Sequence, residues 1–400
     1  MSLKIGLFND SFPPTIDGVA NAVKSYAENI EQRYGTPVVI TPKYPHVVDR
    51  YPYEVYRYSS TGVWNKIPYR VGNPFSPTTI NELLKKHLDL FHVHCPFASM
   101  VLARQLNATG VFQKHIPTIF TYHTKFDIDI DKFVRNRPLR KVAKQFCLNN
   151  IRYADEVWVV SKGAGRDLEQ FGYKGEYLVM PNGTDYDHEK APQPQIDEIN
   201  RLYRLDPNET VFLFVGRMMW YKNLQLILDT LQLTAKAGVP FKAIFVGDGV
   251  DRPVIEQYAK NLGLGDRTIF TGAIYDREKI KAYFSRANLF LFPSTYDTSG
   301  LVVREAASCD CASLLVRGSC AAEGVQDGVS GLLAEENAES CAKKLVEAVR
   351  QNALENLGKA AGEKVYYSWS QAVDKVRKNI TKPQKVTHFV AAGAFCRFKN

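Results

Sequence analysis

The sequence predicts an α/β protein with two Rossmann-like domains, each built around its own parallel sheet. Short apolar segments typical of buried strands alternate with longer segments of helical periodicity, which is the pattern of βα units. The alternation occurs twice, before and after a proline-rich stretch at residues 190–195. A chain of 400 residues also exceeds what one ordinary core accommodates, so two domains are expected.

The strands of the first domain are predicted from six short apolar segments. These are residues 5–8, 38–41, 90–94, 118–122, 156–160 and 177–180. Residues 19–32 and 97–106 lie between them and are expected to be helices. The first domain is therefore predicted to span residues 1–188.

The second series of strands and helices begins at Thr210. Residues 211–215 and 287–292 are its clearest buried strands, and residues 301–307 have helical composition. The second domain is predicted to span residues 189–368.

Two further segments are predicted from composition. Its prolines make residues 190–195 a stiff linker in front of the second series. The basic segment 369–400 follows the second domain, and two alternatives stay open for it. It crosses back to the first domain, or its end, around residues 389–395, is disordered.

Composition excludes several classes of protein. No run approaches the roughly 18 apolar residues that a membrane span requires, and the first apolar segment fits a core strand rather than a leader peptide. The seven cysteines are odd in number and show no C-x-x-C spacing, which argues against a disulfide framework or a zinc site. Cys309 and Cys311 are expected to be small buried residues. We therefore expect a cytoplasmic protein with reduced thiols.

An acid precedes and a second acid follows the point where the strand 287–292 gives way to the helix 301–307. Asp297 and Glu305 flank the N-terminus of this helix, where unpaired N–H groups and the helix dipole favour a phosphate anion. The alternative is that Asp297 and Ser299 cap the helix and Glu305 is a solvated surface acid.

Two cations follow the strand 211–215 after the turn at Gly216. Arg217 and Lys222 are typical of a phosphate clamp, because fixed cationic side chains stabilise negative charge without a metal. The alternative is a pair of exposed loop charges. The acidic run about 80 residues later favours the clamp.

Together with other motifs in the same order, these runs resemble the retaining nucleotide-sugar glycosyltransferases of family 4. The motifs are Lys4-Ile-Gly-Leu-Phe, Asp17-Gly18-Val19, His92-Val-His94, Thr121-Tyr-His123-Thr124, Val160-Ser161-Lys162, Met180-Pro-Asn-Gly-Thr-Asp185, Gly216-Arg217 with Lys222, Val246-Gly-Asp-Gly249, Phe270-Thr-Gly272 and the acid pair. Each is weak alone, but their order over roughly 340 residues is specific. The resemblance implies the GT-B fold, in which two Rossmann-like domains face each other across a cleft.

The resemblance also implies roles for the charged residues. Glu305 matches the second acid of an E-x7-E pair, which holds the ribose hydroxyls, and Asp297 matches the first acid, which faces the donor sugar. Arg217 and Lys222 match the positions that neutralise the diphosphate.

Further roles follow from the same resemblance. His123 matches a histidine beside the sugar-transfer centre, and Gly18 matches a glycine loop that closes over the diphosphate. Amides around Gly300, Leu301 and Val302 are expected to bind oxygens of the donor. The other expected donor contacts are Gly216, Gly272 and Ser299.

Three positions depart from the family pattern. Asp297 is one methylene shorter than the usual Glu, so its contact with the sugar requires a shifted loop or a water. Asp17 stands in the usual double glycine. After Glu305, the expected Gly-x-Pro turn is Asp310-Cys311-Ala312, which is expected to change the geometry after the helix.

The net charge of +9 is concentrated in the first domain and the C-terminal segment. Residues 132–152 contain seven cations and no acid, and Pro138 is placed to start a helix. Its apolar stripe comprises Leu139, Val142, Ala143 and Phe146. Two interpretations stay open. The stripe packs on the sheet with the cations solvated, or the helix lies on an anionic membrane.

The other basic and acidic motifs point to no nucleic-acid or metal site. The cations lack the interleaved aromatic residues of a base-stacking platform, so no nucleic-acid partner is expected. Asp127-Ile-Asp129-Ile-Asp131 contains D-x-D twice but is interpreted as an acceptor-side or solvated acidic loop. His92 and His94 are interpreted as a satisfied polar strand end.

The predicted reaction is retaining transfer of a hexose, from UDP-glucose or a related NDP-sugar, to an acceptor hydroxyl. The Tyr122-His-Thr124 motif is similar to the subgroup that glycosylates diacylglycerol and related lipids from the cytoplasmic face, so the acceptor is a sugar or a lipid. No metal and no cofactor besides the donor are expected. The alternatives are a non-catalytic nucleotide-sugar-binding scaffold and a sugar-nucleotide epimerase. The sequence leaves the base, sugar, linkage and oligomeric state undetermined.

Overall fold

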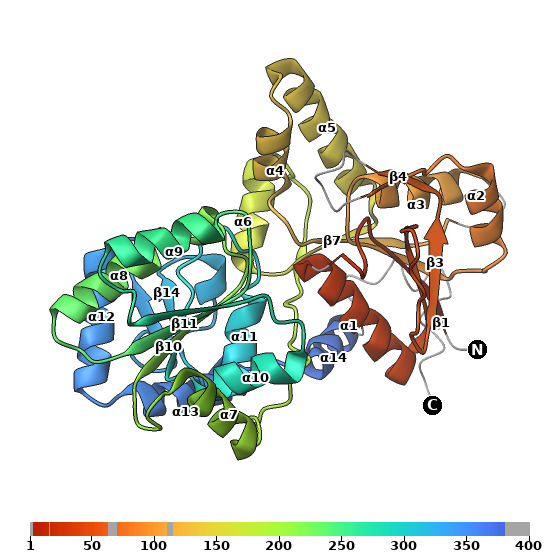
Figure 1. Cartoon of the computed structure of the whole chain (residues 1–400). Helices are drawn as coiled ribbons and strands as arrows, with labels where there is room; N and C mark the ends of the chain where they lie inside the picture. The colour runs from red at the N-terminus through yellow and green to blue at the C-terminus, as the bar shows by residue number, and fades with distance from the viewer. Residues whose placement is uncertain (1–2, 16, 63–69, 110–114, 381–400) are drawn as a thin grey trace. The chain divides into compact units, whose positions relative to one another are not determined.

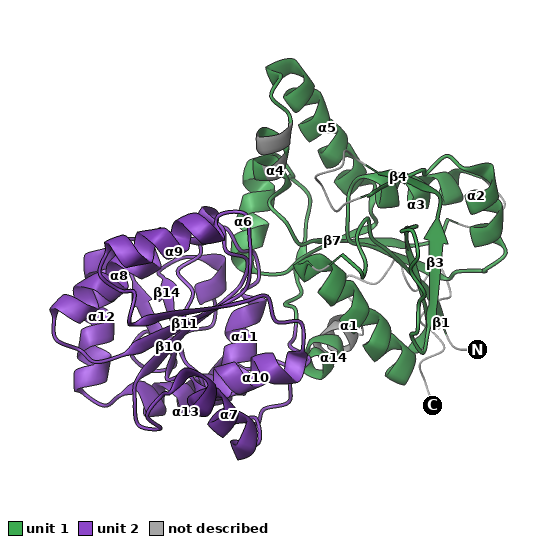
Figure 2. Ribbon diagram, viewed as in Figure 1, with its two compact units in different colours: residues 1–182, 369–400 green, residues 183–368 purple. Residues whose placement is uncertain are grey.

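The computed structural model describes residues 3–15, 17–62, 70–109 and 115–380. The chain divides into two compact units, one of residues 1–182 and 369–400 and one of residues 183–368 (Figure 2). Each unit contains one parallel sheet with helices around it (Figure 1). The predicted α/β class with two parallel sheets is therefore confirmed.

The first unit has a seven-stranded parallel sheet within its described residues, in the order β3-β2-β1-β6-β7-β8-β9. These strands are β1 (Leu3–Phe8), β2 (Gly35–Pro42), β3 (Glu54–Tyr58), β6 (Leu90–Val93), β7 (Thr118–Tyr122), β8 (Glu156–Val159) and β9 (Leu178–Val179). A separate antiparallel pair is formed by β4 (Ser60–Gly62) and β5 (Arg70–Gly72). All six predicted strands of this domain are confirmed, and β3 is an addition to them.

Helices connect these strands. They are α1 (Gly18–Arg33), α2 (Pro77–Leu84), α3 (Ala98–Ala108), α4 (Phe126–Phe133), α5 (Arg137–Tyr153) and α6 (Lys162–Phe171). The predicted helices 19–32 and 97–106 correspond to α1 and α3. The start of α1 is fixed by Asp17, whose carboxylate accepts a hydrogen bond from the Ala20 amide at 2.7 Å. Within the described residues, no helix has both the length and the apolar character of a membrane span.

The C-terminal helix α14 (Trp369–Ile380) belongs to the first unit although it follows the second in the chain. It packs against α1, where Arg33 donates to the Ser370 hydroxyl at 2.6 Å and Tyr34 donates to Asp374 at 3.1 Å. Residues 381–400, and with them the predicted alternatives for 389–395, lie outside the described residues.

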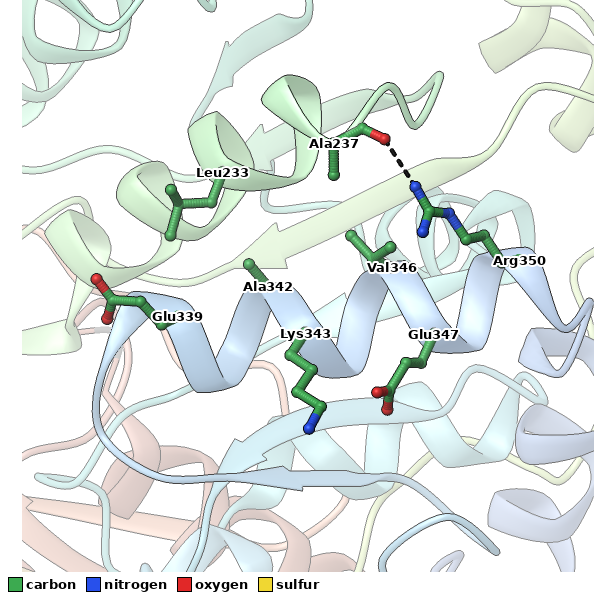
Figure 3. A pocket seen from close by; sticks show the side chains of 8 residues that line it. All are labelled: Leu233, Ala237, Glu339, Ala342, Lys343, Val346, Glu347 and Arg350. Carbon is green, nitrogen blue, oxygen red and sulfur yellow. Dashed lines mark hydrogen bonds between the residues drawn. The ribbon is translucent and has the colours of Figure 1, made fainter.

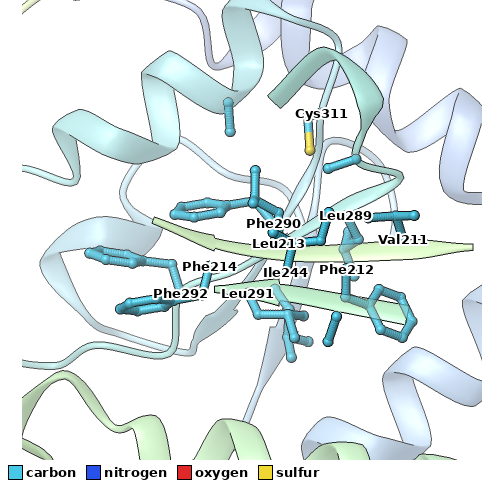
Figure 4. Packing of buried hydrophobic residues seen from close by; sticks show 14 of the residues in the cluster. Val211, Phe212, Leu213, Phe214, Ile244, Leu289, Phe290, Leu291, Phe292 and Cys311 are labelled. Carbon is cyan, nitrogen blue, oxygen red and sulfur yellow. The ribbon is translucent and has the colours of Figure 1, made fainter. Parts of the chain in front are cut away.

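The second unit has a six-stranded parallel sheet within its described residues, in the order β12-β11-β10-β13-β14-β15. The strands are β10 (Val211–Val215), β11 (Lys242–Val246), β12 (Thr268–Gly272), β13 (Leu289–Leu291), β14 (Ser313–Val316) and β15 (Leu332–Ala334). The two central strands, β10 and β13, are buried, and their phenylalanines pack with the leucines between them (Figure 4). Because both strands are buried, their sequences are continuous apolar runs.

The helices of the second unit form two groups. They are α7 (Gln193–Tyr203), α8 (Leu224–Lys236), α9 (Arg252–Asn261), α10 (Arg277–Arg286), α11 (Leu301–Ser308), α12 (Ala338–Arg350) and α13 (Leu354–Lys364), with short 3₁₀ turns η1 (Trp220–Lys222) and η2 (Cys320–Ala322). Helix α8 packs against α9 and α12, whereas α10 packs against α7 and α11. Helices thus cover both faces of the sheet (Figure 1).

The predicted linker 190–195 was wrong in part. Helix α7 begins at Gln193, and Pro192 and Pro194 lie at its N-terminal end. Proline is well tolerated in the first turn of a helix, because its missing N–H would have no helical partner there. The same residues that predict a stiff linker therefore start a helix.

The turn after α11 contains Asp310, which lies in the left-handed conformation with φ of 53°. A glycine adopts this conformation without strain, whereas a residue with a Cβ does not. The Asp310 carboxylate lies 3.0 Å from Nε2 of His188, which stacks on Tyr366. The side chain of Asp310 therefore has a contact in the second unit that a glycine could not make.

This conformation predicts different stabilities for two small substitutions of Asp310. Asp310→Gly and Asp310→Ala both remove the contact with His188, but only alanine keeps the strain of a Cβ at positive φ. We expect the free energy of unfolding of the glycine variant to exceed that of the alanine variant by about 1 kcal/mol. Urea denaturation of both variants measures this difference. Equal stability, or a more stable alanine variant, would contradict it.

Candidate active site

The loops that carry the predicted clamp leave the carboxyl ends of β10 and β11, which are tied together through their backbones. The Gly216 amide donates to the Val246 carbonyl at 3.0 Å, and the Met218 amide donates to the Asp248 carbonyl at 2.9 Å. A Cβ on Gly247 would lie 1.9 Å from the Gly216 carbonyl oxygen, so only glycine fits there. This close approach fixes where the Arg217 loop starts.

Lys222 and Asp297 meet in the folded unit although they are 75 residues apart in the chain. Nζ of Lys222 lies 2.6 Å from Oδ1 of Asp297, and the side chains are 13% and 25% exposed. The ammonium also lies 5.7 Å from the centre of the Phe292 ring. Oδ2 of Asp297 is buried and has no hydrogen-bond partner among the described residues. The sequence predicted both residues for the site but not their contact.

Asn223 fastens the Lys222 turn to the loop before α11. It follows η1 with φ of 57°, and its side-chain amide donates to the Pro293 carbonyl at 2.8 Å. The same amide donates to Glu336 at 2.7 Å. Asn223 was not singled out from the sequence, although asparagine is one of the few residues besides glycine that adopt the left-handed conformation.

Helix α11 begins without a side-chain cap. Its N-cap residue is Gly300, with φ of 57°, and neither Asp297 nor Ser299 caps it. A Cβ at Gly300 would lie 2.8 Å from Cα of Ala321. The capping interpretation was therefore wrong. The first-turn amides of Leu301 and Val302 lie in the part of a helix that attracts an anion.

Glu305 lies on α11 and is buried, so the alternative interpretation of a solvated surface acid was wrong. Its Oε1 lies 2.9 Å from Nη1 of Arg277, the first residue of α10. Burial raises the pKa of Glu305, and the positive charge of Arg277 acts against this rise. Arg277 was not predicted from the sequence, because no motif marks it.

Other predicted donor contacts lie on the same edge of this sheet. Arg217 is exposed in the loop after β10, and Gly272 is the last residue of β12, where its carbonyl accepts from the Gly247 amide at 2.9 Å. Gly18 and His123 belong to the first unit, at the start of α1 and directly after β7. A Cβ on Gly18 would meet nothing within 4 Å.

His123 is part of a buried group of three histidines. Its Nε2 lies 2.9 Å from Nδ1 of His94, and Nε2 of His92 lies 2.7 Å from the Thr121 hydroxyl. Burial lowers the pKa of His92 and of His123 to about 3, and it also lowers that of His94. All three rings are therefore neutral near pH 7.

The predicted polar strand end at His92 and His94 needs a correction. Nε2 of His94 is buried without a hydrogen-bond partner among the described residues, so this end is not fully satisfied. Aromatic rings enclose the pair instead, since Tyr26 packs against both imidazoles and against Trp369 of α14. The C-terminal helix thus packs against the histidine group through Tyr26.

The double D-x-D motif lies on helix α4 and not on a loop, so that interpretation was wrong in its structure. Asp131 pairs with Arg140 and Lys144 of α5, at 3.3 and 2.8 Å. Across the described residues, no three His, Cys, Asp or Glu side chains are grouped to hold a metal ion. Metal independence stays a prediction.

A shallow groove of about 420 Å³ lies between α8 and α12 (Figure 3). Leu233, Ala342 and Val346 line it, and Arg350 closes one end by donating to the Ala237 carbonyl at 2.9 Å. None of the predicted site residues lines this groove, so its chemistry does not bear on the candidate site.

Two family models match the two halves of the chain. Residues 16–188 match Glycosyltransferase Family 4, and residues 195–364 match Glycosyl transferases group 1. The chain belongs to the family 4 glycosyltransferases. Its two parallel sheets are those of the GT-B fold, as the resemblance implied.

Among relatives of this glycosyltransferase are two alpha-monoglucosyldiacylglycerol synthases. The Streptococcus pneumoniae enzyme is 26% identical over 76% of this chain and 68% of its own length. The Acholeplasma laidlawii enzyme is 23% identical over 88% of this chain and 89% of its own. The crystal structure of Anabaena HepE in complex with UDP and glucose matches with a TM-score of 0.72 and 16% identity, over 96% of this chain and all of that one.

The neutral histidines of the glycosyltransferase predict acid sensitivity. An unfolded histidine takes up a proton near pH 6.5, whereas in the folded protein the pKa of His92 and His123 is about 3. Below pH 6.5 the unfolded state therefore binds more protons. The free energy of unfolding should fall by about 1.4 kcal/mol per pH unit for each such histidine.

Urea denaturation between about pH 6.5 and pH 4.5 checks this prediction. His92→Asn should lose stability less steeply with falling pH than the unchanged protein. His46→Asn is a matched control, because His46 is exposed. Identical slopes in all three proteins would show that the buried imidazoles do not govern the acid response.

Proposed function

We propose that this protein transfers glucose from UDP-glucose to the hydroxyl of a membrane glycerolipid, with retention at the anomeric carbon. The observation that carries the proposal is the Lys222–Asp297 pair beside the uncapped N-terminus of α11. The names of the two diacylglycerol relatives support the acceptor. The UDP and glucose in the HepE structure support the donor.

The second unit supplies the groups that stabilise a departing diphosphate. Lys222 carries the charge, and its bond to Asp297 holds the ammonium near the first turn of α11. Arg217 is exposed on the adjoining loop, and the amides of Leu301 and Val302 add oriented dipoles. Charge that develops on the leaving oxygen would therefore meet fixed donors without solvent reorganisation.

Asp297 has a second task in this proposal. Its Oδ2 is buried and without a hydrogen-bond partner among the described residues, so it is available to accept a hydroxyl of the donor sugar. The shorter side chain compared with glutamate is no obstacle to the contact with Lys222. Asp297 thus orients both the ammonium and the sugar.

The proposed reaction is a same-face substitution through an oxocarbenium-like transition state. The bond between the sugar and the diphosphate breaks while the acceptor oxygen bonds to the same face. The leaving diphosphate oxygen takes the acceptor proton. His123 enters as a neutral imidazole that offers a hydrogen bond and no charge.

Removing either cation tests the chemistry. Lys222→Ala and Arg217→Ala are each expected to lower turnover roughly a hundredfold, because one fixed donor to the transition state is lost. Transfer from radiolabelled UDP-glucose to diacylglycerol in vesicles measures it. Lys343→Ala, an exposed cation of α12 in the same unit, is the control. Unchanged turnover in both site variants would refute the proposed clamp.

The N-terminal half of α5 supports the proposal of a lipid acceptor. Leu139 is 60% exposed, Val142 65% and Phe146 44%, so the interpretation of this stripe as sheet-packing was wrong for these three residues. Cys147 and Ile151, in the C-terminal half, are buried instead. The N-terminal half projects from the sheet of its unit (Figure 1).

Cations surround the exposed apolar side chains of α5. Arg137 and Lys141 are exposed, and Arg140 and Lys144 are partly buried against Asp131. Apolar side chains rimmed by cations match the chemistry of an anionic bilayer surface, which attracts each cation by about 1 kcal/mol. We therefore propose peripheral binding to the cytoplasmic face of a membrane through α5.

Vesicle sedimentation tests this surface. Leu139→Asp with Val142→Asp should reduce binding to vesicles containing anionic phosphatidylglycerol at least tenfold, since both buried area and charge attraction are lost. Val254→Asp is the control, because Val254 is 59% exposed on α9 of the other unit. Wild-type binding by the double variant, or an equal loss in the control, would exclude α5 as the docking surface.

A further inference from the structure

Arg277 joins two carboxylates that lie far apart in the sequence. Its guanidinium lies 2.9 Å from Oε1 of Glu305 on α11 and also pairs with Asp185. The two acids approach it from different segments of the second unit. A planar guanidinium is suited to this, because it offers several donors in a rigid fork.

Tyr186 holds the guanidinium in place. Its ring lies 4.2 Å from the Arg277 guanidinium carbon, and its hydroxyl donates to the Arg277 carbonyl at 2.7 Å. The helix that carries Arg277 is fixed at the same end, since Asp276 caps it by accepting from the amides of Glu278 and Lys279. Arg277 is therefore positioned from its backbone and from its side chain.

Glu305 depends on this cation. Its side chain is 8% exposed, and a buried carboxylate without a partner becomes protonated rather than staying charged. A charged carboxylate accepts hydrogen bonds from hydroxyl groups more strongly than a neutral acid does. The ion pair with Arg277 therefore favours the charged carboxylate of Glu305, which is the form that binds two neighbouring hydroxyl groups more strongly.

We infer that Arg277 is a positioning residue that holds Glu305 ionised and oriented for the ribose hydroxyls of the donor. The inference rests on the proposed function and on the ribose role that the family resemblance implies for Glu305. It adds that Arg277, which belongs to none of the sequence motifs, sets the preference for ribose over a sugar lacking those hydroxyls. Asp185 and Tyr186 act through Arg277.

The test compares the affinity of the full-length protein for UDP and for 2′,3′-dideoxyuridine diphosphate by calorimetry. The ratio of the two dissociation constants measures ribose recognition and does not depend on the fraction of folded protein. We expect the unchanged protein to prefer UDP roughly 10- to 100-fold. Arg277→Gln should reduce the ratio to about that of Glu305→Ala, and Arg277→Lys should keep part of it.

Arg317→Gln is the matched control. Arg317 also bridges two carboxylates, Asp327 at 2.7 Å and Glu335 at 3.2 Å, but contacts none of the proposed donor groups. The control should keep the full ratio. Thermal melting of each variant verifies that it is folded.

Different outcomes separate the inference from the proposal on which it rests. If the ratio falls in Glu305→Ala but is unchanged in Arg277→Gln, Arg277 has a structural role only and the inference is wrong. A rise in UDP affinity in Arg277→Gln would also overturn it, because the arginine would then shield Glu305. If the unchanged protein binds UDP without ribose preference, the ribose role of Glu305 itself fails.

Discussion

Close backbone contact at the carboxyl edge of the second sheet is the constraint on which the candidate site depends. Gly247 approaches the Gly216 carbonyl so closely that no Cβ fits, and the Met218 amide bonds to the Asp248 carbonyl. The loop after β10 must therefore leave the sheet in one direction. Asn223 then fastens it to Pro293, and Lys222 reaches Asp297. Parallel strands end at one edge, so residues from distant motifs meet there.

Two acids of the candidate site are each paired with a cation. Lys222 forms an ion pair with Asp297, and Arg277 forms one with Glu305. The two pairs differ in the remaining contacts of their side chains. Asp297 keeps a buried oxygen without a partner among the described residues, while Glu305 is held by a guanidinium that a tyrosine ring supports. A neighbouring cation favours the ionised form of a carboxylate in a partly buried site, and an ionised carboxylate accepts stronger hydrogen bonds than a neutral acid.

The first unit combines a neutral interior with a charged exterior. Burial keeps the imidazole of His123 neutral, and Trp369 of the C-terminal helix packs on Tyr26 behind the histidines. The exposed half of α5 has the opposite character, with apolar side chains among cations. A neutral hydrogen-bonding group suits a transfer centre where charge develops on the donor. A basic amphipathic helix suits an anionic surface.

The sequence by itself determined the α/β class, the two parallel sheets, the family and the identity of the charged residues in the second unit. Strand β7 and helix α11 were predicted almost to the residue, because buried strands and amphipathic helices leave local periodic patterns. Tertiary structure decided the rest. The contact of Lys222 with Asp297, the contact of Arg277 with Glu305 and the exposure of Leu139 depend on which loops meet and which faces are covered. Strand order and packing determine those features, and neither can be predicted from a local sequence pattern.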